Sequence, residues 1–231
     1  MKISVALAAY KGEQYIAEQI ESILCQLGEN DEIVVSDDFP KGKTKNIILN
    51  LASKDKRIRY IEGKGEGVVK NFENALRNCT GDIIFLSDQD DIWLPKKVEN
   101  VVKEIENGAS LVLHDAAVTD AALNITDRSY FLSHGSNASF VGNIVKNSFV
   151  GCCMAFTKEL MLETLPFPKE LPMNDWWIAL VALKNKHKIV LLREPLILWR
   201  RHGGNVTGGK TSFAQKIAWL LKIILSLARI K

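Results

Sequence analysis

Residues 3 to 88 repeat one pattern, in which a short apolar run, a polar turn and a segment with helical periodicity follow one another. The apolar runs cover residues 3–9, 32–38, 57–62 and 82–88. Between the first two runs, Ile16, Ile20 and Ile23 recur at helical spacing and mark one apolar face. Strands that are apolar on both faces indicate a parallel sheet covered by helices on either side. The sequence therefore predicts an α/β fold built on a mostly parallel sheet.

The second half of the chain continues this pattern less regularly. A helix is expected after Pro95, because proline favours the first turn of a helix. The further elements expected are strands at 109–118, 148–157, 188–194 and 196–201 and a helix at 174–186. Residues 120–147 are rich in Asn, Ser and Gly, and we expect a long functional or mobile loop there.

Composition narrows the functions open to the chain. With 231 residues, of which 47% are hydrophobic, it can bury one substantial core, and we expect one domain with a C-terminal appendage. The net charge of +3, without Lys/Arg runs interleaved with aromatic residues, predicts no nucleic-acid partner. The N-terminus has no signal-peptide pattern and the four cysteines form no CxxC pair, so we expect a cytoplasmic protein with reduced thiols.

Asp88, Asp90 and Asp91, here called the acidic cluster, stand directly behind the apolar run at 83–86. Ionised carboxylates this close repel one another, so the cluster makes physical sense around a divalent cation or with all three side chains solvated. In an extended segment residues i and i+2 point the same way, so Asp88 and Asp90 are expected to share a side. Mg²⁺ and Mn²⁺ prefer such oxygen ligands.

Other interpretations of the acidic cluster differ in how well they fit the sequence. An EF-hand loop needs Gly at its sixth position, where Trp93 stands. Phosphatases that form an aspartyl-phosphate carry D-x-D behind the first strand, followed by Gly-Thr, whereas here it lies behind the fourth. A solvated acidic turn that caps the helix after Pro95, with Asp91 as a capping residue, remains open.

Polar or aromatic residues also follow the first two predicted strands. Tyr10 and Lys11 come after the first strand, and Asp37 and Asp38 end the second. Ligands of parallel sheets bind beyond the carboxyl ends of the strands. We therefore expect these side chains and the acidic cluster to converge on one edge of the sheet.

Several segments resemble family 2 glycosyltransferases of the GT-A fold, and are most similar to the bacterial rhamnosyltransferase-like branch that builds surface polysaccharides. In chain order they are ISVALAAYKGEQYIAEQIESIL, EIVVSDD, FLSDQDDIWLPKKV, GCCMAFTKEL, NDWWIALVA and LILWRRHGGNVTG. The resemblance implies a Rossmann-like, mostly parallel sheet flanked by helices. It also implies a catalytic domain over residues 1–209, with a nucleotide-binding half at 1–92 and an acceptor and catalytic half at 93–209.

The resemblance implies a role for each matching residue of the nucleotide-binding half. Ala9 and Tyr10 would border the base, and Asp38 would hydrogen-bond the base or ribose. Asp88 would contact the ribose or the metal. Asp90 would bind the divalent cation, Mg²⁺ or Mn²⁺, that bridges the two phosphates.

In the second half, the resemblance implies that Asp175 is the general base, which takes the proton of the acceptor hydroxyl. The metal would neutralise the departing nucleoside diphosphate, and a single in-line displacement would invert the anomeric centre. Arg200 would contact the leaving group, and His202 would contact it or the metal. Trp176 and Trp177 fit either core packing or, for one of them, the acceptor-sugar site.

The chain departs from the family pattern after Asp38. Residues 39–44, FPKGKT, stand where the family commonly has a Gly/Ser-rich turn with another Asp. Lys41 and Lys43 are placed to approach phosphates, but recognition of the base is left open by this difference.

Residues 210–231 are expected to form an amphipathic C-terminal helix. Gln215, Lys222, Ser226 and Arg229 form its polar stripe, and Lys222 interrupts the apolar run, so the helix is not expected to span a membrane. A basic helix over 213–231 fits a peripheral position at a membrane interface, with Trp219 near the headgroups. Packing against the catalytic domain, or against a second copy in a homodimer, is an equally good interpretation.

We thus expect an inverting, metal-dependent glycosyltransferase that moves a sugar from a nucleotide-diphosphate sugar to a hydroxyl of a glycan or lipid-linked acceptor. It would serve bacterial surface polysaccharide synthesis, in the cytoplasm or peripherally on the inner face of the cell membrane. The alternatives are a non-catalytic nucleotide-sugar or carbohydrate-binding module of the same fold, and a peripheral membrane scaffold.

Overall fold

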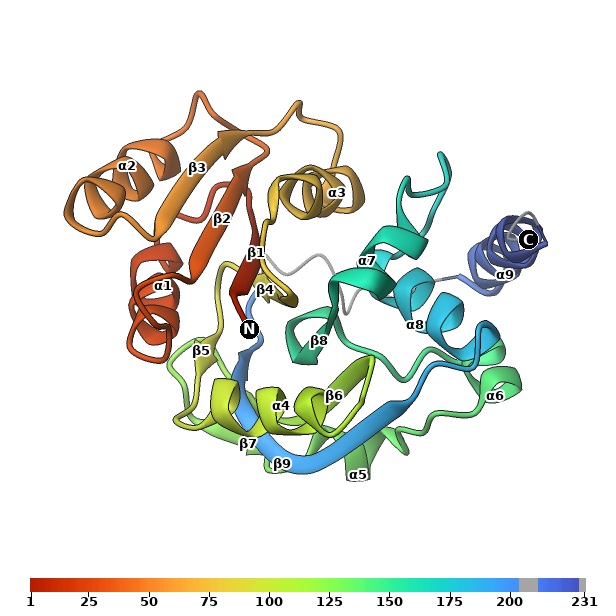
Figure 1. Ribbon diagram of the computed structural model, residues 1–231. Helices are drawn as coiled ribbons and strands as arrows, with labels where there is room; N and C mark the ends of the chain where they lie inside the picture. The colour runs from red at the N-terminus through yellow and green to blue at the C-terminus, as the bar shows by residue number, and fades with distance from the viewer. Residues whose placement is uncertain (204–211, 229–231) are drawn as a thin grey trace.

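The computed structural model describes residues 1–203 and 212–228 (Figure 1). Within these ranges the chain forms a 9-stranded sheet in the order β3-β2-β1-β4-β8-β6-β9-β5, with β7 paired to β6. The strands are β1 (Ile3–Ala9), β2 (Glu32–Asp37), β3 (Ile58–Glu62), β4 (Ile83–Asp88), β5 (Ile92–Trp93), β6 (Leu111–Thr119), β7 (Ile125–Asp127), β8 (Met154–Thr157) and β9 (Ile189–Arg200). The helices are α1 (Ile16–Leu24), α2 (Thr44–Lys54), α3 (Val68–Asn78), α4 (Lys97–Glu106), α5 (Tyr130–His134), α6 (Phe140–Val145), α7 (Lys158–Thr164), α8 (Asn174–Lys184) and α9 (Phe213–Leu227), and a 3-10 turn, η1, covers Gly151–Cys153.

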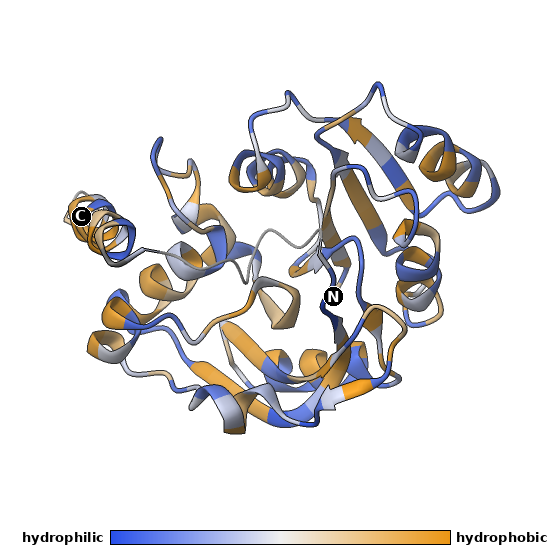
Figure 2. Ribbon diagram, turned by 180° about the vertical axis from the view of Figure 1, so that it is seen from behind, coloured by the Kyte–Doolittle hydropathy of each residue, from blue (hydrophilic) through white to orange (hydrophobic). Residues whose placement is uncertain are grey.

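The strands of the first half are parallel and buried, as their continuous apolar runs predict. β1 lies between β2 and β4, and β2 also pairs with β3, all in parallel. Every residue of β1 and β2 is buried, because α1 and α2 cover one face and α3 the other (Figures 1 and 2). The predicted α/β fold is therefore confirmed, but the sheet as a whole is mixed, because β5, β7 and β8 pair antiparallel with their neighbours.

β8 joins the two halves of the sheet, since it pairs antiparallel with both β4 and β6. On the far side of β6 the structure has one long strand, β9, parallel to β6, where the sequence predicts two short strands. Pro195 lies within β9 and has no N–H to donate, and the pairing with β6 shifts register there. The prediction of two strands was wrong because an irregularity in the pairing accommodates the proline.

The predicted long loop at 120–147 was also wrong, because this segment contains β7, α5 and α6. Two of its serines are helix caps: Ser129 accepts a hydrogen bond from Leu132 N, and Ser139 accepts one from Gly142 N. Buried Asp115 of β6 also accepts a hydrogen bond from Phe131 N at 2.8 Å. In residues 148–157 only β8 is a strand, and η1 precedes it.

The helix α9 follows the sheet and packs lightly on the second half. Ile223 and Leu227 are buried, and Lys184 of α8 donates a hydrogen bond to Leu227 O at 2.9 Å. No helix in the described parts of the chain has the length and apolar character needed to cross a bilayer. The predicted division at residues 92 and 93 stays a prediction, and the boundary at 209 and 210 lies outside the described residues, as does Arg229 of the predicted polar stripe.

Candidate active site

The carboxyl ends of β1, β2 and β4 lie side by side, as parallel pairing of these strands requires. Ala9 ends β1 and is buried, and it pairs with Asp37 of β2, while its neighbour Ala8 pairs with Asp88 of β4. The amide of Asp38 donates to Ala9 O at 2.9 Å. The residues expected at the donor site therefore share one edge of the sheet, although their roles stay predictions.

The Asp38 carboxylate holds the loop that leads into α3. It accepts hydrogen bonds from Gly65 N and Gly67 N, each at 2.8 Å, and both glycines have positive φ. A Cβ at Gly63 would come within 2.7 Å of Asp38 Oδ1. Sequence reasoning missed this loop, although the glycine spacing in residues 63–67 was a signal for it. Asp37 accepts a hydrogen bond from Phe39 N at 3.0 Å and so caps the turn that follows β2.

One side chain joins the loop after β1 to the loop after β4. Gln89 accepts a hydrogen bond from Tyr10 N at 2.8 Å and donates one to Tyr10 O at 2.9 Å. Gly12 lies against this amide, since a Cβ there would be 2.2 Å from Gln89 Oε1. Sequence reasoning missed Gln89 because its partner is 79 positions away. The pair fixes the half-exposed Tyr10 relative to the acidic cluster.

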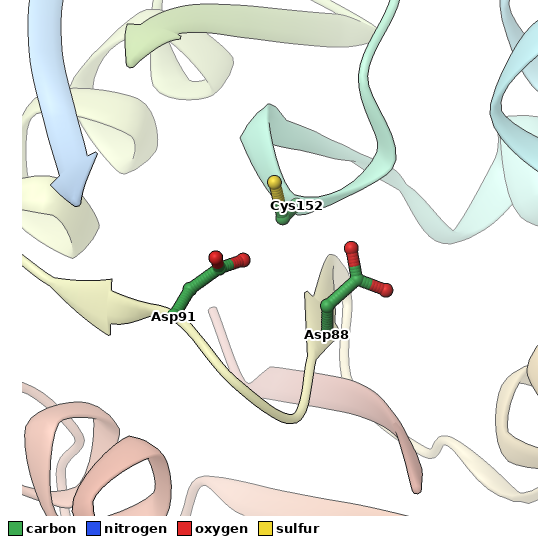
Figure 3. A group of neighbouring side chains, drawn as sticks. All are labelled: Asp88, Asp91 and Cys152. Atoms are coloured by element: carbon green, nitrogen blue, oxygen red, sulfur yellow. The ribbon is translucent and has the colours of Figure 1, made fainter. Parts of the chain in front are cut away.

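The acidic cluster does not have the geometry of an extended D-x-D. The chain bends at residues 89 and 90, and the carboxylate that converges with Asp88 is that of Asp91 (Figure 3). One oxygen of each, with the Sγ of Cys152 from η1, lies within 4.8 Å of the others. Asp91 Oδ1 accepts from Arg200 N at 3.0 Å, whereas its buried Oδ2 has no hydrogen-bond partner among the described residues.

This arrangement fits a divalent cation. Burial, together with the carboxylates of Asp91, Asp90 and Asp175, raises the pKa of Asp88 well above its usual range. Burial and Asp90 raise the pKa of Asp91 to about 7. A buried carboxylate oxygen without a partner is costly, and a bound cation would relieve both this cost and the repulsion. Asp88 and Asp91 would hold such an ion, and the Sγ of Cys152, which sequence reasoning missed, lies beside them.

Buried Lys97 of α4 lies close to this group of donors. Its Nζ donates to Cys152 O at 2.8 Å and stands 4.1 Å from the centre of the Trp93 ring. Burial lowers the pKa of Lys97 to about 8. Its positive charge partly offsets the carboxylates and also fixes the backbone of η1 against the acidic cluster.

Asp90 and His202, the predicted metal ligands, lie together. Asp90 Oδ2 is 2.8 Å from His202 Nε2, and the imidazole packs on the ring of Tyr15. Arg200 Nε donates to Asp90 O at 2.9 Å, and its Nη2 forms an ion pair with Glu18 at 2.7 Å. Arg200 thus ties the acidic cluster to α1. The assignment of Asp90 and His202 to a metal, and of Arg200 to the leaving group, stays a prediction.

Asp175 lies in the first turn of α8, close enough to Asp88 to raise its pKa. Its Oδ1 accepts from Trp176 N at 2.6 Å and its Oδ2 from Gly151 N at 3.1 Å. A Cβ at Gly151 would lie 3.7 Å from Asp175 Cβ and 3.8 Å from Leu86 Cδ1, so the backbone of η1 connects β4 to Asp175. Burial raises the pKa of Asp175 to about 6 despite these hydrogen bonds. A carboxylate with this pKa is suited to accept a proton near neutral pH.

The two tryptophans that follow Asp175 belong to the core. Trp176 Nε1 donates to Asn143 O at 2.6 Å, and Trp177 Nε1 donates to Thr164 O at 3.0 Å. Both rings are buried. Of the two interpretations open from the sequence, core packing therefore holds for both residues, and together they anchor α8 and its Asp175.

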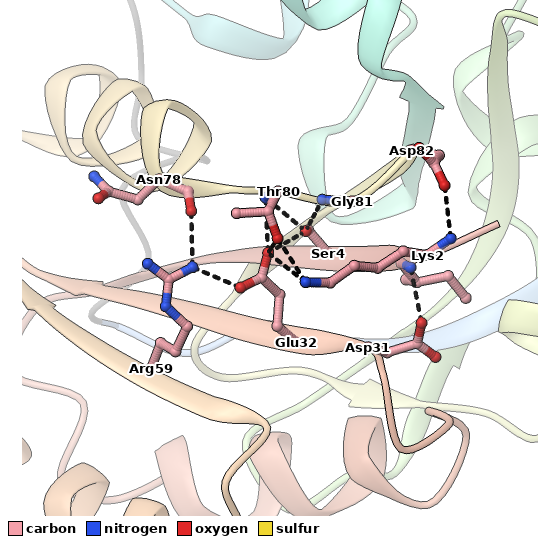
Figure 4. A network of polar contacts seen from close by, with 10 residues as sticks. Lys2, Ser4, Asp31, Glu32, Arg59, Asn78, Thr80, Gly81 and Asp82 are labelled. Atoms are coloured by element: carbon pink, nitrogen blue, oxygen red, sulfur yellow. Dashed lines mark hydrogen bonds and ion pairs between the residues drawn. The ribbon is translucent and has the colours of Figure 1, made fainter.

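A separate polar network lies at the opposite, amino-terminal edge of the sheet (Figure 4). Buried Glu32 accepts hydrogen bonds from Ser4 Oγ at 2.6 Å and Thr80 N at 2.7 Å, and pairs with Arg59 at 2.6 Å. Burial alone would raise the pKa of Glu32, but these partners outweigh it and lower the pKa to about 2. The network links β1, β2, β3 and the segment before β4, and it stabilises the sheet that positions the site.

Comparison with known proteins agrees with this geometry. The sequence model of the family described as glycosyl transferase family 2 matches residues 4–164. The chain is 26% identical to the dTDP-rhamnosyl transferase RfbG of Shigella flexneri over an alignment of 226 residues that covers 91% of this chain and 76% of that protein. It is 27% identical over 213 residues to an uncharacterized glycosyltransferase of Rickettsia felis, covering 89% of this chain but only 34% of that relative. The chain thus spans about a third of the length of this longer relative.

Solved structures show the same fold. S. aureus TarS 1–349, in complex with UDP-GlcNAc, superposes with a TM-score of 0.78 at 18% identity, covering 100% of this chain and 68% of that chain. The mannosyltransferase PcManGT from Pyrobaculum calidifontis, in complex with GDP-Man and Mn²⁺, gives a TM-score of 0.66 at 16% identity, and the match covers 98% of this chain and 74% of that chain. The expected GT-A fold is confirmed. Because the family match covers most of the chain, the protein belongs to glycosyl transferase family 2.

Proposed function

We propose that this chain is an inverting, metal-dependent glycosyltransferase that moves a sugar from a nucleotide-diphosphate sugar to a hydroxyl of a glycan or lipid-linked acceptor. One observation carries the proposal: Asp175, with a pKa raised to about 6, lies beside the acidic cluster at the carboxyl edge of the sheet. The named relatives support a role in bacterial surface polysaccharide synthesis, since RfbG is a rhamnosyl transferase and TuaG of Bacillus subtilis is a putative teichuronic acid biosynthesis glycosyltransferase.

The donor would bind across the carboxyl ends of β1, β2 and β4. Ala9 and Tyr10 would border the base, and Asp38 retains lone pairs to accept from the base or ribose beside its two backbone donors. Asp88 and Asp90 would face the diphosphate. A Mg²⁺ or Mn²⁺ ion held by the acidic cluster would supply charge neutralisation for the leaving nucleoside diphosphate. The complexes of TarS with UDP-GlcNAc and of PcManGT with GDP-Man and Mn²⁺ support this class of donor and cation.

Asp175 would act on the acceptor. Its carboxylate takes the proton of the acceptor hydroxyl while the hydroxyl oxygen forms a bond to the anomeric carbon, and the bond from that carbon to the diphosphate oxygen breaks. The electron pair of the broken bond leaves with the nucleoside diphosphate. Attack and departure on opposite faces of the sugar invert the anomeric centre. Gly151 N and Trp176 N hold the carboxylate in place for this step.

The test is sugar transfer from a panel of nucleotide-diphosphate sugars, including dTDP-rhamnose, with Mg²⁺, Mn²⁺ or a chelator. The Asp175→Asn variant is expected to lower kcat by about a hundredfold or more while donor binding, measured by calorimetry, persists. Glu159→Gln is the matched control, because Glu159 is likewise a first-turn acid, in α7, but is exposed and lies away from the acidic cluster. Full activity in Asp175→Asn would refute the assigned role. Metal-dependent donor binding without any turnover would favour the non-catalytic binding module instead.

A further inference from the structure

The helix α9 has two apolar faces, of which only one is buried. Ile223 and Leu227 face the second half of the domain, where α9 packs on α6 and α8. A second set of large apolar side chains on α9 is exposed to solvent, with these exposed fractions: Ile217 43%, Leu221 55%, Ile224 44% and Leu225 62%. Their spacing places them on one side of the helix. In Figure 2 much of α9, beside the C mark, has the orange colour of apolar residues.

The neighbouring helix α6 also exposes apolar residues. Val141 and Val145, four positions apart on one face of α6, are 69% and 76% exposed. We call the exposed apolar residues of α6 and α9 the apolar surface. Large exposed apolar side chains gathered on two helices in contact with each other mark a site of interaction with a partner or a membrane.

Charge indicates which of these it is. From residue 195 to the end of the sequence there is no Asp or Glu, whereas the basic residues there are Arg200, Arg201, Lys210, Lys216, Lys222, Arg229 and Lys231. Lys216 and Lys222 are exposed on α9, and Lys222 pairs at 3.0 Å with the exposed Glu170, which is a weak interaction. In a symmetric dimer this basic helix would face its own copy, so like charges would meet. An anionic lipid surface instead complements both the charge and the apolar residues.

We infer that the apolar surface of α6 and α9 docks on the headgroup region of an anionic membrane. The purpose of this docking rests on the proposed function, because it would bring the site to a lipid-linked acceptor. α6 is connected directly to the base: Asn143 O accepts from the Trp176 indole, and Asn147 Nδ2 lies 3.5 Å from Asp175 Oδ1. A membrane held by α6 therefore lies on the Asp175 side of the site.

The test is flotation of the full chain with vesicles of phosphatidylcholine, alone or mixed with anionic phosphatidylglycerol. We expect binding to the anionic vesicles that weakens as salt is raised. Replacing two exposed leucines, in the Leu221→Ser/Leu225→Ser variant, should raise the lipid concentration for half-maximal binding about tenfold or more. Leu49→Ser is the matched control, since Leu49 is 43% exposed on α2 at the opposite end of the molecule (Figure 1). The control should bind as the unmodified chain does.

Equal vesicle binding by the double variant and the unmodified chain would overturn the inference. A second outcome would also overturn it: the unmodified chain does not bind vesicles but forms a dimer in sedimentation velocity, and the double variant is a monomer. The apolar surface would then bind a second copy of the chain. Calorimetry of donor binding in solution separates this inference from the proposed function. The double variant should still bind the donor but no longer bind vesicles. Asp175→Asn should still bind vesicles but no longer transfer sugar.

Discussion

Replacing Asp175 with Asn should inactivate the enzyme and also stabilise the fold at neutral pH. The pKa of Asp175 is raised from 3.8 to about 6, so the folded state binds this proton more tightly than the unfolded state does. Ionised Asp175 therefore costs folding free energy. The cost is absent below about pH 4, grows as the pH rises, and is complete above about pH 6. A shift of this size corresponds to roughly 3 kcal/mol.

The variant recovers most of this cost. Asparagine has one side-chain oxygen for the two backbone donors, Gly151 N and Trp176 N, so one of these N–H groups loses its partner at a cost of about 1 kcal/mol. The net gain of about 2 kcal/mol would raise the Tm of a domain of this size by about 4–8 °C at pH 7.5. Calorimetric scans at pH 7.5 and pH 4 measure it, and the gain should vanish at pH 4. An unchanged or lower Tm at pH 7.5, or a gain independent of pH, would refute the reasoning.

Three further predictions concern other parts of the molecule. Glu32→Gln should lower the free energy of unfolding by roughly 3 kcal/mol at pH 7, because the pKa of Glu32 is lowered to about 2. Urea titrations should find that this difference between the variant and the unmodified chain shrinks as the pH falls from 4.5 towards 2. Gln89→Ala removes both hydrogen bonds to Tyr10 and should weaken donor binding about tenfold in calorimetry. Gly12→Ala displaces the Gln89 amide and should have the same effect, and unchanged donor affinity in both variants would show that the hydrogen bonds between Gln89 and Tyr10 do not position the donor site. Cys152→Ser should reduce the affinity for thiophilic Cd²⁺ far more than that for Mg²⁺, and equal losses would show that Sγ is not a ligand.

The sequence predicts those parts of the structure that depend on local pattern. Burial of β1 and β2 follows from their apolar runs, and the shared edge of Ala9, Asp38 and Asp88 follows from parallel pairing. The helix at α8 follows from its apolar residues, and its first-turn Asp175 was singled out by resemblance to the family. These features need no knowledge of distant contacts beyond the rule that strands of a βαβ unit lie side by side.

The features that were not predicted depend on tertiary contacts. An extended D-x-D would align Asp88 with Asp90, but the chain bends at Gln89, whose amide pairs with Tyr10, and Asp91 converges on Asp88 instead. Cys152 approaches from a segment far along the chain, so no spacing indicates it. The caps and hydrogen bonds that order residues 120–147 likewise use Asn and Ser, the residue types that made the segment resemble a loop.

The central claim is that Asp175 accepts the acceptor proton beside the acidic cluster, and the dependence of kcat on pH tests it most directly. For the unmodified chain with saturating donor and Mn²⁺, kcat should fall about tenfold for each pH unit below 6, because only the ionised carboxylate accepts a proton. In Asp175→Asn, kcat should be low and independent of pH over this range. A variant that keeps both the rate and the acid limb of the unmodified chain would contradict the account.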